Sequence, residues 1–194
     1  MDDIKKYANF FIDYFSKKGE ENDLTNMKLN KLLYFAYGLY LAKTGKKLFN
    51  GDFRAYKHGP VEVSIYNKYK TFGTNPISSI DNSNDEFPED IFETLIDTLS
   101  KYGDKPSWYL SNLTHDDFNS PWKKVDYLKK EKIKDEDLVD YFKDKLPKSI
   151  NEITKEKETF GYINKDGDLV FPDDDEDKDD SFLVVLEKNL YNNI

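Results

Sequence analysis

Two histidines offer the most direct route to chemistry in this sequence, His58 in KHGPV and His115 in LTHDDFNSPW. General acid–base catalysis needs a histidine within hydrogen-bond reach of a reacting proton, usually oriented by a third group. Asp116 follows His115 directly, but adjacency in sequence does not establish that geometry. A catalytic role for either histidine therefore needs support from other residues.

The order of these residues also fits a class of all-helical metal enzymes. Histidine–aspartate phosphohydrolases use a first histidine, a later His-Asp pair and a final aspartate, and four residues occur in that order: His58, His115, Asp116 and Asp140. Imidazole and carboxylate groups suit a divalent metal. A chain with 38 acidic residues meets so loose a pattern by chance. We therefore keep this enzyme as the alternative and expect no catalytic residue, metal or cofactor.

Composition predicts a folded protein. A chain of 194 residues can remove roughly 70% of its unfolded surface from water, and 14 Phe and 14 Tyr supply large buried areas. Cysteine is absent, which excludes disulfides, thiolate nucleophiles and Cys-ligated zinc. The N-terminus lacks the apolar core of a signal peptide, and no apolar run is long enough to span a bilayer. We expect a cytoplasmic protein without membrane contact.

The negative charge is concentrated near the C-terminus. The net charge is -9, and DDDEDKDD at residues 173–180 contributes -6 through seven acids and one lysine. A negative field disfavours contact with phosphate backbones, so we expect no nucleic-acid partner. Blocks of like charge are usually solvated loops.

Helical periodicity dominates the first 147 residues. The longer expected helices have an apolar stripe and a stop or cap residue, and they cover residues 3–17, the segment from a Thr25 cap to Gly45, the segment from Pro60 to Gly73 and the segment from Pro88 to Gly103. A short helix is expected at WYLSNLTH and a last one before Pro147. Between these two we expect a turn, with Ser120 as cap and Pro121 as the first helical residue. The predicted fold class is mainly α, within α+β.

The His58-Gly59-Pro60 junction is expected to change the direction of the chain. An extended segment runs through Tyr56, and Pro60 suits the first position of a helix because its φ is fixed. We expect the His58 imidazole to hydrogen-bond to the incoming strand. Glu62 would then lie in the first helical turn, where a carboxylate is favoured.

The pattern changes after Pro147. TFGYINKDGDLVF predicts a β-hairpin around residues 165–167, and SFLVVLE predicts another strand after the acidic run. We therefore divide the chain into a helical domain, residues 1–147, and a C-terminal extension, residues 148–194, with a β-hairpin, an acidic loop and a final strand.

Three phrases, in this order and spacing, are together more specific than any single motif. They are MKLNKLLYFAYGLYLAKTGKKLF, FRAYKHGPVEVSIYNKY and LSNLTHDDFNSPWKKV. From residue 25 to about 130, the chain resembles the Panacea domain, the SocA-like family of antitoxins.

The resemblance implies a compact, mainly helical, non-enzymatic domain. Such antitoxins neutralise a cognate toxin from a neighbouring gene, usually by direct binding, in bacterial and phage operons, and some relatives deliver the toxin to a Clp-type protease. A phage-encoded inhibitor of another host system is a further alternative. The residues that belong to the motifs, and are candidates for partner binding, are Lys28, Lys31, Tyr34, His58, Gly59, Pro60, His115, Pro121 and Trp122.

Overall fold

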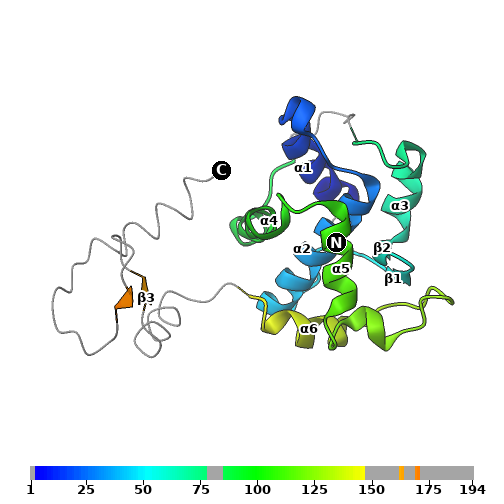
Figure 1. Cartoon of the computed structure of the whole chain (residues 1–194), viewed down its shortest axis with the longest axis vertical. Coiled ribbons are helices and arrows are strands. Elements are labelled where there is room, and N and C mark those ends of the chain that lie inside the picture. Colours follow the sequence, from blue (N-terminus) through cyan, green and yellow to red (C-terminus); the bar gives the residue numbers. More distant parts are fainter. Residues whose placement is uncertain (1–2, 78–84, 147–161, 164–168, 171–194) are drawn as a thin grey trace. The chain divides into compact units, whose positions relative to one another are not determined.

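The computed structural model describes residues 3–77, 85–146, 162–163 and 169–170. The chain divides into two compact units, residues 1–146 and 147–194. In the first unit, the described residues form α-helices and one small antiparallel hairpin (Figure 1). The mainly α prediction is confirmed.

The elements of the first unit are defined by their bounds among the described residues. In chain order they are α1 (Ile4–Ser16), η1 (Gly19–Glu21), α2 (Asn26–Thr44), β1 (Phe53–Tyr56), β2 (Gly59–Glu62), α3 (Val63–Tyr69), η2 (Lys70–Phe72), α4 (Glu89–Tyr102), α5 (Ser107–Asp116), η3 (Pro121–Lys124) and α6 (Asp135–Lys143), where η denotes a 3-10 helix.

Helix α2 is the centre of this unit, and α1, α3, α4, α5 and α6 all pack against it (Figure 1). Its residues from Leu29 to Leu41 are buried on every side, as in a core helix. Thr25 caps its start by accepting a hydrogen bond from the Lys28 amide, and Gly45 ends it in the left-handed conformation. Among the described residues, no helix has the length and apolarity needed to cross a membrane.

Aromatic side chains fill the space around α2. The rings of Phe35 and Tyr102 stack with centroids 4.1 Å apart, and Tyr34 meets Phe53 and Phe142 edge-on at 5.5 and 5.6 Å. Edge-to-face and offset contacts are the favoured geometries of such rings. The expectation that Phe and Tyr supply the core is confirmed.

The predicted start of the third helix is wrong. Pro60 lies in strand β2, which pairs antiparallel with β1, and α3 begins only at Val63. An edge strand tolerates a proline because its missing amide need not join the ladder. The helix begins later because the Glu62 carboxylate accepts a hydrogen bond from the Ile65 amide and so caps it. Pro121, in contrast, does open a helix, η3, behind a Ser120 cap.

The second unit is described only by two short strands. Strand β3 (Tyr162–Ile163) pairs antiparallel with β4 (Leu169–Val170). The expected turn at residues 165–167, the acidic run at 173–180 and the final strand lie outside the described residues, as do residues 78–84 of the first unit. The predicted arrangement of hairpin, acidic loop and final strand in the extension therefore stays a prediction.

Candidate functional site

The three sequence motifs meet at the turn between β1 and β2. Four backbone carbonyls of this turn each lie within hydrogen-bond distance of a side chain from another element. The four atom pairs are Tyr56 O and Trp122 Nε1 (2.8 Å), Lys57 O and His115 Nε2 (3.1 Å), His58 O and Ser111 Oγ (3.0 Å), and Pro60 O and Lys31 Nζ (2.8 Å). We call residues 56–60 with these four side chains the hairpin corner. It joins β1 and β2 to α2, α5 and η3.

Lys31 contributes the buried amino group of the corner. Its side chain is almost completely inaccessible, and Nζ donates to Pro60 O. Burial lowers the pKa of Lys31 from 10.5 to about 7 because the charged form loses its hydration. A lysine so placed orients the backbone of β2 but cannot reach a partner at the surface.

Gly59 makes the approach of Lys31 possible. Its φ is +94°, a conformation that other residues rarely adopt. A Cβ at this position would collide with Thr114 Oγ1 and lie 2.9 Å from Lys31 Cε. Glycine is therefore required both for the turn and for the contact with α2 and α5.

His115 uses both ring nitrogens within the corner. Nδ1 lies 2.6 Å from Ser111 O, Nε2 lies 3.1 Å from Lys57 O, and the ring centroid is 4.1 Å from that of Trp122. A carbonyl oxygen can only accept a hydrogen bond. Both nitrogens are thus directed at backbone carbonyls, although a neutral imidazole can donate to only one of them.

His58 takes part through its backbone. Its side chain is exposed, and no hydrogen bond between described residues involves the imidazole. The expected contact between that ring and the incoming strand is therefore not found. The His58 carbonyl accepts from Ser111 Oγ instead.

The alternative of a metal phosphohydrolase gains no geometric support. Within the described ranges, no three His, Cys, Asp or Glu side chains lie together as ligands for a metal. Asp140 is on α6, where its exposed carboxylate lies 4.0 Å from Lys143 Nζ. The two histidines thus meet at the hairpin corner, while Asp140 lies on α6 and pairs with a lysine of its own helix.

Lys28 and Tyr34 are also inside the molecule. Lys28 Nζ lies 2.7 and 2.8 Å from the two carboxylate oxygens of Asp23 and 4.6 Å from the Phe15 ring centroid. Burial lowers the pKa of Lys28, although the Asp23 carboxylate opposes this effect. Tyr34 is buried, and its hydroxyl has no hydrogen-bond partner among the described residues. Burial raises the pKa of Tyr34 well above its ordinary value.

Pro121 and Trp122 differ in exposure. Pro121 is buried, whereas Trp122 is half-buried and stacks on Tyr127, with ring centroids 5.3 Å apart and planes inclined by 20°. Trp122 is thus a motif residue that holds the corner and also reaches the surface.

Sequence reasoning missed two asparagines of α2. Asn30 Oδ1 accepts from the Glu62 amide at 3.0 Å, and its Nδ2 donates to both oxygens of Asn26 at 2.9 Å. Asn26 Nδ2 in turn donates to Tyr66 O. Two asparagines four positions apart in an apolar helix were the available signal, since buried amides need partners.

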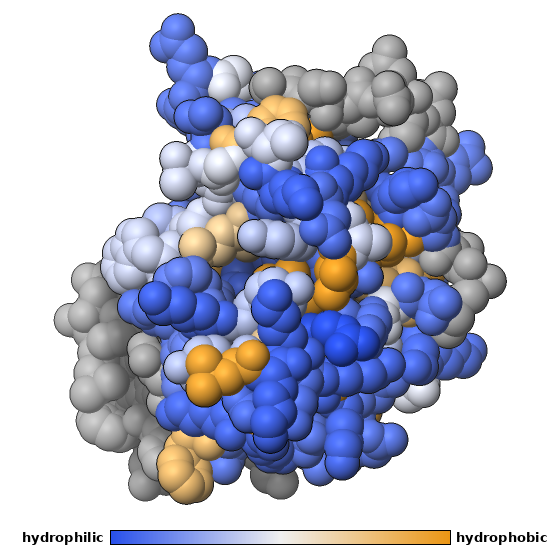
Figure 2. Space-filling model, turned by 90° about the vertical axis from the view of Figure 1, so that its right-hand side faces the viewer, coloured by the Kyte–Doolittle hydropathy of each residue, from blue (hydrophilic) through white to orange (hydrophobic). Residues whose placement is uncertain are grey.

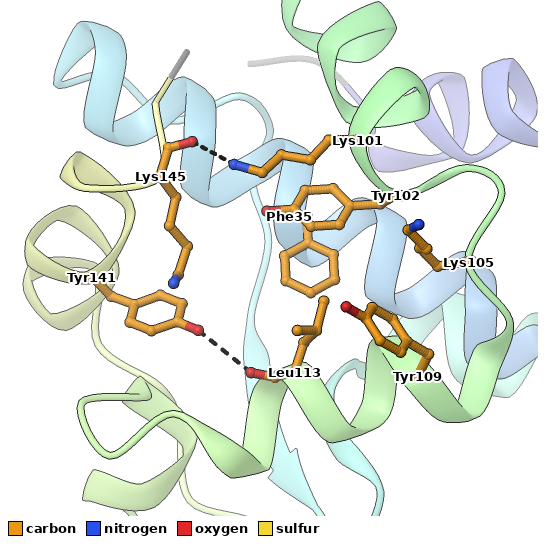
Figure 3. A pocket seen from close by; sticks show the side chains of 8 residues that line it. All are labelled: Phe35, Lys101, Tyr102, Lys105, Tyr109, Leu113, Tyr141 and Lys145. Carbon is orange, nitrogen blue, oxygen red and sulfur yellow. Dashed lines mark hydrogen bonds between the residues drawn. The ribbon is translucent and has the colours of Figure 1, made fainter. Parts of the chain in front are cut away.

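A pocket of about 240 Å³ lies between α4, α5 and α6 (Figure 3). Its lining includes three lysines and three tyrosines, but Lys101 Nζ donates to Lys145 O at 2.9 Å and Lys145 Nζ pairs with Asp117 at 3.1 Å. Burial, together with the nearby Lys145, lowers the pKa of Lys101. Because two of the three ammonium groups already bind the protein itself, the pocket gives no clear site for a ligand.

Comparison with known proteins supports the resemblance drawn from the motifs. Residues 29–123 match the family described as antitoxin SocA-like, Panacea domain. The resemblance to the Panacea domain is confirmed. Antitoxin SocA of Caulobacter vibrioides is 37% identical over 71 residues, which are 37% of this chain and 37% of that protein. The aligned region thus spans little more than a third of the curated relative. No solved structure gave a significant match.

The Panacea segment, residues 29–123, contains the whole hairpin corner. Lys31, residues 56–60, Ser111, His115 and Trp122 all lie within it. The corner that fixes the β-hairpin to the helices therefore includes six of the nine motif residues: Lys31, His58, Gly59, Pro60, His115 and Trp122.

Proposed function

We propose that this chain is an antitoxin that binds a protein toxin directly and neutralises it in the cytoplasm. The observation that supports this function is the Panacea match over residues 29–123, together with the similarity to a protein named Antitoxin SocA. The toxin would be the product of a neighbouring gene. The extension beyond residue 147 would contribute to the choice of toxin.

The geometry of the hairpin corner supports a structural role for its side chains. Both ring nitrogens of His115 face backbone carbonyls, and Lys31 is buried. An acid–base catalyst needs a group within reach of a substrate proton, and the backbone contacts of these two side chains support a non-enzymatic role instead. We propose that the motif residues hold the fold and that exposed residues elsewhere contact the toxin.

Co-expression with the neighbouring gene tests this function. The neighbour alone should arrest bacterial growth, and the full chain should restore growth and copurify with the neighbour's product. A neighbour that is harmless, or that does not copurify with the chain, would contradict the proposal.

Sequestration of the toxin and its delivery to a protease predict different half-lives for the toxin. We propose sequestration; the alternative is delivery of the toxin to a Clp-type protease, which would then be a second partner. The half-life of the toxin should then be unchanged when the antitoxin is induced. A shorter half-life that returns to normal in a host without the protease would show delivery instead.

A further inference from the structure

Residues 123–134, KKVDYLKKEKIK, form a basic segment in an acidic protein. Six lysines and two acidic residues give this segment a net charge of +4, whereas the whole chain carries -9. We call it the lysine loop. It begins at the end of η3, continues to the start of α6, and lies almost entirely outside the Panacea segment (Figure 1).

Hydrogen bonds hold the tip of the lysine loop in one conformation. The Lys130 amide donates to Tyr127 O and the Glu131 amide to Asp126 O, both at 3.2 Å. The side chains of Asp126 and Glu131 accept from the amides of Leu128 and Asp126, both at 2.9 Å. Lys130 has a φ of +52°, which is uncommon for a residue other than glycine. Such a conformation persists only where the surroundings determine it.

The base of the loop is attached to β1. The Ala55 amide donates to Glu131 O at 2.9 Å, and the Ile133 amide donates to Phe53 O at 2.8 Å. Ile133 is buried in the core. The loop is therefore supported by the same strand whose far end belongs to the hairpin corner.

This ordered loop exposes apolar side chains. Leu128 is 78% exposed and Tyr127 is 40% exposed, with one face of the Tyr127 ring covered by Trp122. Figure 2 shows that the side of the molecule carrying this loop in Figure 1 is largely hydrophilic, with small separate hydrophobic areas. An ordered leucine held in water loses the free energy that its burial would provide, about 1.5–3 kcal/mol.

Partly exposed carboxylates neutralise part of the charge of the loop. Ion pairs join Lys129 to Asp126 at 3.4 Å, Lys124 to Asp137 at 2.8 Å and Lys132 to Asp52 at 3.2 Å, and Lys130 Nζ lies 4.9 Å from the Tyr56 ring centroid. Pairs of exposed charges contribute little and are screened by salt. The positive potential of the loop therefore stays available to a partner of opposite charge.

We infer that the lysine loop is a docking site for an acidic surface of the neutralised protein, with Leu128 entering an apolar depression on that surface. This inference rests on the proposed antitoxin function and names the part of the chain that would carry it. Complementary charge would speed association, and a buried apolar anchor would slow dissociation. A nucleic-acid ligand is disfavoured because the chain is acidic overall and the loop presents a leucine at its tip.

The test uses the full chain and the purified product of the neighbouring gene. Leu128→Ser and the double variant Lys129→Glu/Lys130→Glu should each raise the dissociation constant at least tenfold. The matched control is Lys5→Glu/Lys17→Glu, which makes the same change in net charge at two exposed positions, one in the first turn of α1 and one at its C-cap. The control should change affinity by less than threefold. Increasing salt should weaken the wild-type complex more than the complex of the loop double variant.

The outcomes separate this inference from the function on which it rests. If the wild-type chain binds its partner and both loop variants bind equally well, the lysine loop is not the contact, and the antitoxin proposal stands. If the wild-type chain binds no neighbouring product, both proposals are overturned. If the double variant instead loses affinity for a single-stranded oligonucleotide while keeping its protein partner, the inferred occupant is wrong. Circular dichroism should show that all variants remain folded.

Discussion

Lys31 shows how a charged residue can belong to a core. Its ammonium group donates to one carbonyl, Pro60 O, and burial lowers its pKa to about 7. Between about pH 7 and its ordinary value of 10.5, the unfolded chain therefore binds more protons at Lys31 than the folded chain. Stability rises with pH wherever the unfolded state binds more protons.

Replacing Lys31 tests this pH dependence. From pH 7 to pH 9, the free energy of unfolding of the wild type should rise relative to Lys31→Met, by up to about 1.4 kcal/mol per pH unit. Urea denaturation of both proteins at several pH values measures the difference. A difference that does not change with pH would mean that Lys31 keeps its ordinary pKa in the folded state.

Tyr34 is a buried polar residue that, unlike Lys31, has no hydrogen-bond partner for its side chain among the described residues. Tyr34→Phe should leave stability unchanged or increase it by about 1 kcal/mol, since an unsatisfied buried group is removed. The control is Tyr37→Phe, which removes the bond from Tyr37 Oη to Asp135 Oδ1 at 3.0 Å and should cost about 1 kcal/mol. Denaturant titration of the two variants compares them; a destabilised Tyr34→Phe protein would point to a bridging water.

Gly59 distinguishes backbone strain from crowding. Gly59→Ala should cost about 1–2 kcal/mol for its positive φ and about 1–3 kcal/mol for the collision with Thr114 and Lys31. Gly45→Ala is the control, because Gly45 also has a positive φ but nothing lies within 4 Å of its added Cβ. Thermal unfolding should show the larger loss for Gly59→Ala, and equal losses would contradict the crowding.

At the scale of elements, local signals in the sequence predicted the helices well. The Thr25 cap, the Gly45 stop and the Gly103 stop are visible because capping depends on residues close in sequence. The hairpin was missed at Pro60, since a proline at a helix start and a proline in an edge strand look alike without the partner strand. The corner was also out of reach. Its acceptors are backbone carbonyls, which every residue has, so the residue types do not show which carbonyls will accept a hydrogen bond.

The attachment of the hairpin to its neighbours predicts local changes in dynamics. Trp122→Phe removes the donor to Tyr56 O and should speed hydrogen exchange at the Ala55 and Glu62 amides about fivefold, as expected for about 1 kcal/mol of lost hydrogen bonding. Trp108→Phe is the control, since Trp108 is 63% exposed. Exchange within α1 should not change in either variant. Uniform acceleration throughout the molecule would indicate global destabilisation instead.

At the scale of the whole molecule, charge is unevenly distributed along the sequence, and the net charge alone does not reveal this. The acidic run at residues 173–180 is a nearly continuous block, whereas the six lysines within residues 123–134 are interspersed with other residues and do not stand out in the sequence as one surface. Only the fold shows that these lysines belong to a single ordered loop attached to β1. Residues that maintain the fold and residues proposed to bind the partner thus occupy different parts of the first unit.

This separation predicts that stability and affinity can be changed independently. Ser111→Ala removes a hydrogen bond of the hairpin corner, so it should lower the melting temperature by several degrees. Its affinity for the partner, measured well below that temperature, should be unchanged. Lys129→Glu/Lys130→Glu should lower the affinity for the partner and leave the melting temperature unchanged, because both lysines are on the exposed loop. Loss of affinity in Ser111→Ala at a temperature where the protein is fully folded would place the hairpin corner itself in the interface.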